Sequence, residues 1–191
     1  MSRMEIAKEI GYVPQTSSSA QALTVFEVVL MGRRPHIGWQ SSDKDIEKAW
    51  EVLGLLKIEH LAMRSFNELS GGEQQRVIIA RSLAQEAKVL LLDEPTSNLD
   101  IRHQLEVMEL SRELVGKQQL AVVVAIHDLN LASRYCDKIV MMKKGQIVAA
   151  GKPTDVLTPE NIKSVYGVEV AVNYHNQIPN IIPIKPLKTS N

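Results

Sequence analysis

The sequence predicts an α/β fold in which a parallel β-sheet carries an inserted helical segment, and three observations point to it. Apolar β-type runs at residues 89–92 and 120–126 alternate with segments of helical spacing, as in parallel sheets covered by helices on both faces. A helix-rich stretch over residues 23–85 separates these runs from a first strand that ends within residues 11–15. The 191 residues are 45 % hydrophobic and 23 % charged, a composition that can bury a core without disulfides.

Each element has a local signal. Ser70 followed by Glu73 is a capping box that starts a helix, and Asp128 caps the short helix after the second apolar run. Residues 89–92 are continuously apolar, as a strand buried on both faces requires. In chain order we expect a polar loop at 16–21, helices at 23–31, 43–56 and 70–85, a strand at 89–92, a helix at 102–115, a strand at 120–126, a helix at 128–136, strands at 138–142 and 147–150 joined by a turn at 143–146, and a helix at 159–166.

The domain organisation follows from these elements. We expect one domain over residues 1–172, with a helical subdomain at about 23–85 and a core at about 86–150. Residues 173–191 contain three prolines and are expected to form an extended or poorly ordered tail.

The composition argues against several classes of protein. Lys+Arg and Asp+Glu are both 22, and aromatic residues are 4 %, so a strongly basic or base-stacking nucleic-acid binder is not expected. The longest clean apolar run has seven residues, at 120–126, whereas a membrane span needs about 20. A single cysteine, Cys136, excludes an internal disulfide and favours a reducing compartment. Arg33 and Arg34 are expected in a solvated turn, or at most in a docking patch.

Two carboxylates, Asp93 and Glu94, follow the apolar strand at residues 89–92 directly. Ligands of parallel α/β sheets bind at the carboxyl ends of the strands. One carboxylate there can hold Mg²⁺ through water, and the second can polarise an attacking water. The residues alone also fit a strand that ends in solvated acids, which is a common pattern.

Two glycines, Gly71 and Gly72, follow Ser70 at a helix start, where backbone N–H groups and the helix dipole favour a phosphate. A plain capped helix start is the alternative. His127 ends the strand at 120–126 and could contact a phosphate, or be structural or merely exposed. Gln15, just after the first strand, means nothing by itself.

Together these segments resemble five motifs of the ATPase subunits of ABC transporters, in the same order and separation. The resemblance covers about residues 5–170 and implies the P-loop NTPase fold of the ABC type. The corresponding segments are 12–15 for the Q-loop, 69–76 for the signature, 89–94 for the Walker B strand, 97–100 for the D-loop and His127 for the switch histidine.

Within that family the chain is most similar to the ATPases of iron-chelate and cobalamin importers, at residues 28–36, 100–104 and 125–130. The resemblance implies an ATP-binding and ATP-hydrolysing importer subunit for iron-siderophore or cobalamin-type substrates, with haem also open. It implies a peripheral location on the cytoplasmic face of the cell membrane. The implied partners are a second, head-to-tail ATPase subunit, membrane permease subunits and, indirectly, a substrate-binding protein, with no nucleic acid.

The resemblance also implies roles for single residues, with ATP and Mg²⁺ as cofactors. Asp93 would hold Mg²⁺ through water, Glu94 would polarise the attacking water, and His127 would contact the γ-phosphate. Gln15 would sense Mg²⁺ and the γ-phosphate and link them to the membrane subunit.

The signature residues would act on the partner subunit's nucleotide. Ser70, Gly71, Gly72 and Glu73 would bind the ATP of the partner in trans. Asp100 would couple the two sites across the interface.

One family motif is absent from the sequence. No G-x-x-x-x-G-K-[ST] P-loop (Walker A) occurs in the 191 residues, and in the family it precedes the Q-loop, which here begins at Tyr12. We therefore expect an N-terminally truncated domain that lacks its first strands and P-loop, binds ATP weakly on its own and hydrolyses it poorly. The alternative is a non-hydrolytic partner or pseudogene remnant that supplies only the signature face.

Overall fold

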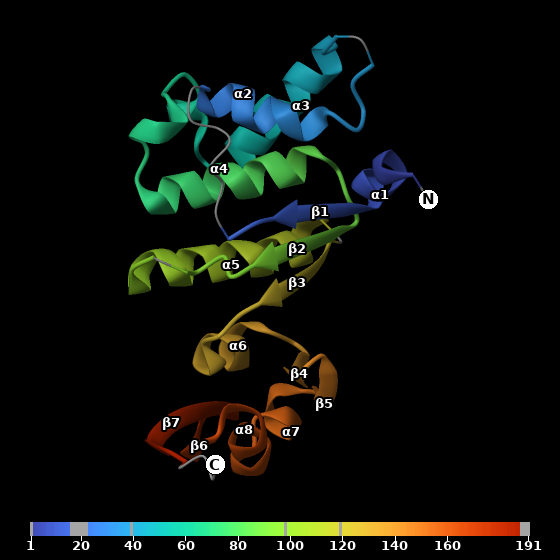
Figure 1. The fold of residues 1–191 in the computed structure, drawn as a ribbon. Coiled ribbons are helices and arrows are strands. Elements are labelled where there is room, and N and C mark those ends of the chain that lie inside the picture. Colours follow the sequence, from blue (N-terminus) through green and yellow to red (C-terminus); the bar gives the residue numbers. More distant parts are fainter. Residues whose placement is uncertain (1, 16–22, 39, 98, 119, 188–191) are drawn as a thin grey trace. The chain divides into compact units, whose positions relative to one another are not determined.

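The computed structural model describes residues 2–15, 23–38, 40–97, 99–118 and 120–187 (Figure 1). The chain divides into two compact units, Met1–Ala125 and Ile126–Asn191. This division differs from the expected single domain over residues 1–172, because the second unit has a hydrophobic core of its own. The expected polar loop at residues 16–21 and Asn98 lie outside the described residues.

The first unit holds a parallel sheet in the order β1-β2-β3, formed by Ile10–Val13, Val89–Asp93 and Ala121–Ala125. The pairs Val13 with Leu92 and Asp93 with Ala125 are in register. The carboxyl ends of the strands therefore meet at one edge of the sheet, as the sequence predicts.

Helices α2, α3 and α4 pack together beside β1 in the region expected as the helical subdomain (Figure 1). Capping boxes open α1, α2 and α4 from Ser2, Thr24 and Ser70. Helix α1 was not expected, although Ser2 and Glu5 carry the same S-x-x-E signal. The elements are α1 (Arg3–Glu9), α2 (Val25–Leu30), η1 (Met31–Arg33), α3 (Asp43–Leu55), η2 (Glu59–Leu61), η3 (Phe66–Glu68), α4 (Gly71–Ala84) and α5 (Ile101–Gln118).

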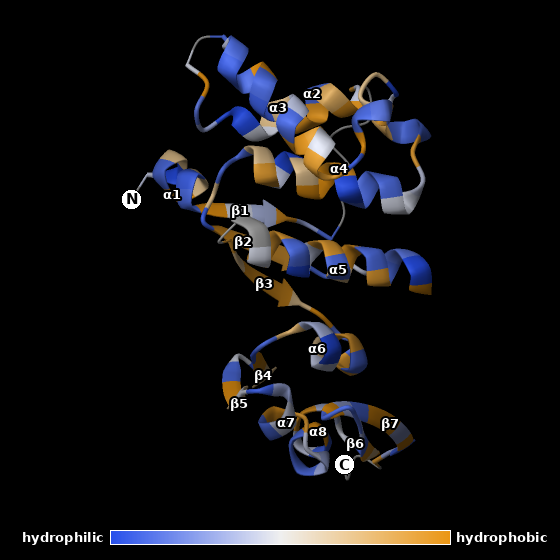
Figure 2. Ribbon diagram, turned by 180° about the vertical axis from the view of Figure 1, so that it is seen from behind, coloured by the Kyte–Doolittle hydropathy of each residue, from blue (hydrophilic) through white to orange (hydrophobic). Residues whose placement is uncertain are grey.

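The two faces of the sheet differ in burial. Leu90 and Leu92 of β2 are buried in one core with apolar residues of α4 and α5. Both helices carry hydrophobic and hydrophilic residues in alternation along their length (Figure 2). On the opposite face, Tyr12 is 52 % and Val123 is 57 % exposed. Within the described part of the first unit the helices therefore bury one face, and the expected burial of β2 on both faces is not observed.

Arg33 is buried, so the expectation of a solvated turn or docking patch is wrong for this residue. Its Nε donates to Asp45 Oδ1 over 3.0 Å, and Nη1 donates to the carbonyl of Ala84 over 2.8 Å. Hydrogen bonds from Ser42 and then from Arg33 lower the pKa of Asp45 to about 2. These contacts tie η1 to α3 and to the end of α4.

The second unit is built on two antiparallel hairpins. In the first, β4–β5, Lys144 and Gly145 form the turn with positive φ, inside the predicted turn at residues 143–146. The second unit contains α6 (Leu129–Tyr135), β4 (Ile139–Lys143), β5 (Gln146–Gly151), α7 (Pro153–Val156), α8 (Pro159–Tyr166), β6 (Val168–His175) and β7 (Ile178–Pro186).

The expectation of an extended or poorly ordered tail from residue 173 is wrong. Strands β6 and β7 form a hairpin around Asn176 and Gln177, which both have positive φ. Its residues Val170 and Ile181 are buried in the core of the second unit. The prolines of β7 are compatible with a strand because every strand of a two-stranded sheet is an edge strand, where missing N–H donors are tolerated.

Candidate functional site

The carboxyl edge of the sheet brings Gln15 next to Glu94. Gln15 lies two residues after β1, and Glu94 directly follows β2, so the parallel pairing of β1 and β2 sets their separation. Gln15 Nε2 donates a hydrogen bond to Glu94 Oε2 over 2.7 Å. A contact between residues so far apart in sequence is a product of the sheet register alone.

The neighbouring carboxylate, Asp93, bonds to Tyr12, which was not among the predicted site residues. Tyr12 Oη donates to Asp93 Oδ2 over 2.9 Å, on the more exposed face of the sheet. This hydrogen bond raises the pKa of Tyr12, because the protonated hydroxyl is the form that donates. We call Tyr12, Gln15, Asp93 and Glu94 together the acidic edge.

Glu94 sits on a sharp turn. Its φ is +45°, in the left-handed region that non-glycine residues rarely adopt. The Glu94 N–H donates to the carbonyl of Ala125 over 3.0 Å, and the Glu94 carbonyl accepts bonds from Ser97 N at 3.0 Å and Ser97 Oγ at 2.9 Å. Bonds on both sides of the residue thus hold the turn that directs its side chain to the edge of the sheet.

The segment from Ser70 to Glu73, which we call the signature turn, has the predicted capping box. Ser70 Oγ accepts from Glu73 N over 3.4 Å, while Ser70 N donates to Glu73 Oε2 over 2.8 Å. The hydrogen bond from the Ser70 backbone lowers the pKa of Glu73 and is the main cause of the shift. The first N–H groups of α4 have no partner within the helix, so the turn can accept an anion.

His103, in the first turn of α5, lies against this turn. A Cβ at Gly72 would be 2.3 Å from His103 Cδ2, whereas one at Gly71 would meet only Leu99 Cδ2, at 3.6 Å. Asp100 Oδ1 accepts from His103 N over 3.0 Å and lies 2.9 Å from His103 Nδ1. No local sequence pattern indicates this contact, because residues 72 and 103 belong to different helices.

His127 belongs to the second unit and lies two residues after the end of β3 at Ala125, one residue farther from the strand than predicted. Its side chain is exposed. Asp128 caps α6 as expected, since its Oδ1 accepts from the N–H groups of Asn130 and Leu131 at 2.8 and 2.9 Å.

The donors of the acidic edge fit Mg²⁺ with a partly aqueous shell. The edge offers carboxylate and amide oxygens, which are the ligands of this hard cation. Among the described residues no group of three or more His, Cys, Asp or Glu side chains is placed to enclose a metal ion. Mg²⁺ keeps several waters and takes further oxygens from substrate phosphates, so one or two carboxylates suffice.

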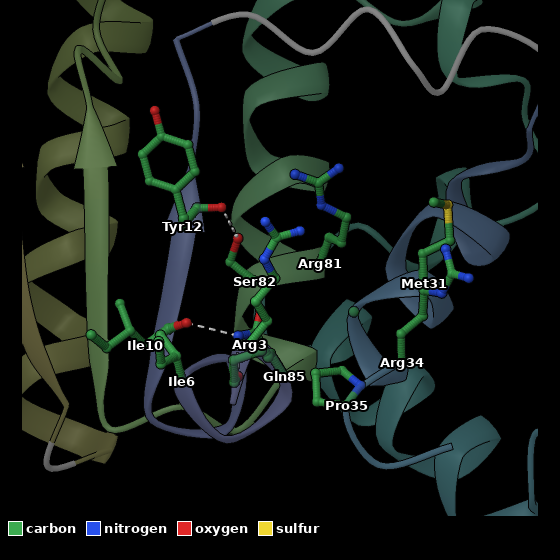
Figure 3. Close-up of a pocket in the computed structure, with 12 residues that line it drawn as sticks. Arg3, Ile6, Ile10, Tyr12, Met31, Arg34, Pro35, Arg81, Ser82 and Gln85 are labelled. Atoms are coloured by element: carbon green, nitrogen blue, oxygen red, sulfur yellow. Dashed lines mark hydrogen bonds between the residues drawn. The ribbon is translucent and has the colours of Figure 1, made fainter. Parts of the chain in front are cut away.

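A pocket of about 470 Å³ lies between α1, β1, η1 and α4 (Figure 3). Three guanidinium groups line it, those of Arg3, Arg34 and Arg81, beside the apolar side chains of Met31 and Pro35. Burial lowers the pKa of Arg81. Among the described residues no carboxylate forms an ion pair with any of these three arginines.

Comparisons with known proteins identify the family. The family described as ABC transporter matches residues 1–97. An ABC transporter ATP-binding protein of Methanocaldococcus jannaschii is 52 % identical over 184 residues, which are 96 % of this chain and 72 % of that protein. The chain belongs to the ABC transporter family.

Relatives named for particular cargoes are also similar. The cobalamin import ATP-binding protein BtuD of Halobacterium salinarum is 44 % identical over 90 % of this chain, but the chain spans only 43 % of that protein. The hemin import ATP-binding protein HmuV of Escherichia coli O157:H7 is 44 % identical over 88 % of the chain and 66 % of its own length. A siderophore transport system ATP-binding protein of Bacillus subtilis is 41 % identical over 88 % of the chain and 62 % of its own length.

Solved structures share the fold of ABC ATPase domains. A metal-chelate type ABC transporter in an inward-facing conformation superposes with a TM-score of 0.85 at 34 % identity, covering 92 % of this chain and 73 % of that one. An ATP-binding cassette solved as a dimer with ADP and Pi superposes with a TM-score of 0.66 at 33 % identity, covering 80 % of this chain and 68 % of that one.

In the part of this chain that the structure describes, no helix has the length and apolarity of a membrane span.

Proposed function

We propose that the chain is part of an ATP-hydrolysing subunit of an ABC importer for iron-siderophore, haem or cobalamin-type substrates. The observation that carries the proposal is the 2.7 Å bond from Gln15 to Glu94, with Asp93 as the next residue of the same edge. One amide and two carboxylates therefore lie at the edge where parallel sheets bind their ligands. The cargo classes come from the names of the relatives for cobalamin, hemin and siderophore import.

The acidic edge is suited to hydrolysis of a phosphoanhydride. Asp93 and Gln15 would hold Mg²⁺ through water, and the ion would supply positive charge for the phosphate oxygens. Glu94 would polarise the attacking water, and the amide of Gln15 orients its carboxylate. His127 would contact the γ-phosphate.

The signature turn would serve the nucleotide of a second ATPase subunit. Ser70, Gly71, Gly72 and Glu73 would bind that ATP in trans, with N–H groups and the dipole of α4 directed at its γ-phosphate. Asp100 would couple the two sites in a head-to-tail dimer. A similar cassette has been solved as a dimer in a post-hydrolysis state, which supports this arrangement.

The pocket lined by Arg3, Arg34 and Arg81, which we call the arginine pocket, is our candidate surface for contact with the membrane permease subunit. Its guanidinium groups complement an acidic segment, and its apolar side chains complement a nonpolar one. The pocket includes Tyr12 of β1, three residues before Gln15, so it adjoins the acidic edge. Docking there would hold the subunit at the cytoplasmic face of the membrane as a peripheral protein.

A second candidate is a non-hydrolytic partner that offers only its signature face. It is favoured by one observation: the signature turn has its complete capping box, while the 191 residues contain no G-x-x-x-x-G-K-[ST]. Such a chain would still complete the nucleotide site of a partner that supplies a P-loop.

Nucleotide titration tests both candidates. We expect the 191-residue chain to bind MgATP weakly alone. In MgATP we expect it to bind to an intact ABC transporter ATP-binding relative chosen because its sequence contains a G-x-x-x-x-G-K-[ST] P-loop. A chimera in which a P-loop segment of that relative precedes Met1 should hydrolyse ATP if the chain is a transport ATPase. An inactive chimera that still forms the ATP-dependent complex supports the non-hydrolytic partner. Tight MgATP binding by the chain alone contradicts the expected need for a P-loop, and absence of any complex contradicts the use of the signature face.

A further inference from the structure

We propose that His103 is a positioning residue that holds the signature turn in its phosphate-binding shape and ties it to the loop that follows Glu94. The inference rests on the proposed function, since it assigns a new residue to the signature side of that site. Three sets of contacts carry it, all within the first unit.

The first is the contact between the imidazole of His103 and Gly72. A Cβ at Gly72 would lie 2.3 Å from Cδ2 and 2.9 Å from both Cγ and Nε2 of His103, so the ring occupies the space of a side chain at position 72. Gly72 is buried, whereas Gly71 is exposed. The second glycine of the signature turn is therefore required by the His103 ring, in addition to any approach of phosphate to the backbone.

The second is the bond that fixes the ring. Asp100 Oδ1 is 2.9 Å from His103 Nδ1 and accepts from His103 N over 3.0 Å. These bonds lower the pKa of Asp100. Gln104 Nε2 donates to the carbonyl of Leu99 over 3.0 Å and so holds the same loop against α5. Because Asp100 Oδ1 holds Nδ1, the imidazole ring cannot turn away from Gly72 without losing its hydrogen bond to Asp100.

The third set continues to Glu94. Ser97 donates through N and Oγ to the Glu94 carbonyl, at 3.0 and 2.9 Å, and Asp100 follows three residues later. Hydrogen bonds thus join Ser97 to Glu94, and contacts join Asp100 through His103 to Gly72, with two positions of the chain between Ser97 and Asp100. In the proposed head-to-tail dimer, Glu94 serves one nucleotide and the signature turn serves the other. His103 would therefore link the two nucleotide sites from within one chain.

The contact itself is tested by NMR on the 15N-labelled chain. His103→Ala should move the amide signals of Gly71 and Gly72 more than those of residues outside 70–104. The matched control, His175→Ala in the second unit, should leave both glycine signals in place. Unchanged glycine signals in His103→Ala would overturn the proposal.

The positioning role is tested by capture of the chain by the P-loop-bearing relative in MgATP. His103→Ala should weaken capture about tenfold without a matching loss in the urea midpoint of unfolding. His103→Asn, which can keep a donor toward Asp100, should recover part of the loss. Gly72→Ala, which displaces the ring, should weaken capture strongly in the wild-type chain and less in the His103→Ala background.

The outcomes separate the two proposals. If the wild-type chain is not captured, the proposed use of the signature face fails and this inference fails with it. If the wild-type chain is captured and His103→Ala is captured equally well, only the inference fails. A loss of capture that matches the loss of stability would make His103 merely structural, and would also overturn it.

Discussion

The signature turn and the acidic edge are assembled over very different lengths of chain. The capping-box bonds of the signature turn lie within residues 70–73. The Tyr12–Asp93 and Gln15–Glu94 bonds of the acidic edge join residues 81 and 79 positions apart. The capping bonds of the turn therefore need only the start of a helix, whereas the bonds of the edge need the whole sheet in register.

This difference predicts which substitutions disrupt the hydrogen bonds of each region. The capping box itself tolerates change elsewhere in the chain, because four neighbouring residues supply its bonds, and the contact of Gly72 with His103 is its long-range support. An edge made by parallel strands is lost when the strands shift, since a shift by one residue turns every side chain to the other face. Four predictions test this contrast.

The largest effect is expected for Glu94→Gln in the P-loop chimera. Removing the residue that polarises water should lower ATP hydrolysis about 10²- to 10⁴-fold, while MgATP binding persists. Steady-state phosphate release measures the rate, and Glu109→Gln on the exposed side of α5 is the control. A chimera variant that keeps its full rate would remove Glu94 from the proposed mechanism.

Gly11→Val should break the acidic edge from a distance. A Cβ at Gly11 would already lie 3.1 Å from Leu90 Cδ1 and 3.3 Å from the Ser82 carbonyl, so the larger side chain separates β1 from its neighbours. We expect a loss of about 1–3 kcal/mol in the free energy of unfolding, measured by urea titration. NMR should show Gln15 perturbed and the amides of the signature turn near their wild-type positions. Gly54→Ala is the control, because nothing lies within 4 Å of that Cβ position.

Ser70→Ala should weaken the signature turn with a smaller, local effect. Loss of the cap is expected to reduce the free energy of unfolding by about 1 kcal/mol and to weaken ATP-dependent capture by the relative. Thr24→Ala removes the equivalent cap of α2 and should give a similar loss of stability with capture intact. Equal losses of capture in the two variants would mean that capture reports only stability.

The smallest effect is expected in the pH dependence of the Glu73 cap. The pKa of Glu73 is lowered on folding, so the unfolded chain binds its proton more readily than the folded chain does. The stabilisation is present above the unfolded pKa and is lost as the pH falls through the lowered folded pKa. Glu73→Gln should thus be less stable than wild type near neutral pH, by about 0.3–1 kcal/mol, and the difference should shrink in acid. Urea unfolding from pH 7 to pH 3 measures it, and a constant difference would contradict the assignment.

Local signals made most of the fold predictable. The S-x-x-E pattern predicted the start of α4, continuous apolar runs predicted β2 and β3, and Asp128 was identified as the cap of α6. The same S-x-x-E pattern at Ser2 and Glu5 would have predicted α1. The β6–β7 hairpin was missed because its proline residues suggested a tail, although an edge strand accepts proline.

The candidate site was predictable as a set of residues and not as a set of contacts. The motifs named Gln15, Asp93 and Glu94, but only the strand register brings Gln15 to Glu94. Tyr12 was overlooked as the partner of Asp93 because the bond depends on which face of β1 the ring occupies. The contact of His103 with Gly72 depends on the packing of α5 beside α4, which no local pattern encodes.

At position 94, the left-handed backbone conformation lowers the stability of the fold, while the glutamate side chain serves the proposed hydrolysis of ATP. A glutamate with φ of +45° carries backbone strain that a glycine would not. Random variants of this chain selected only for resistance to heat should therefore accumulate glycine or asparagine at position 94. Those selected for nucleotide turnover in a P-loop-bearing context should retain glutamate, because the carboxylate is worth more to the reaction than the strain costs the fold.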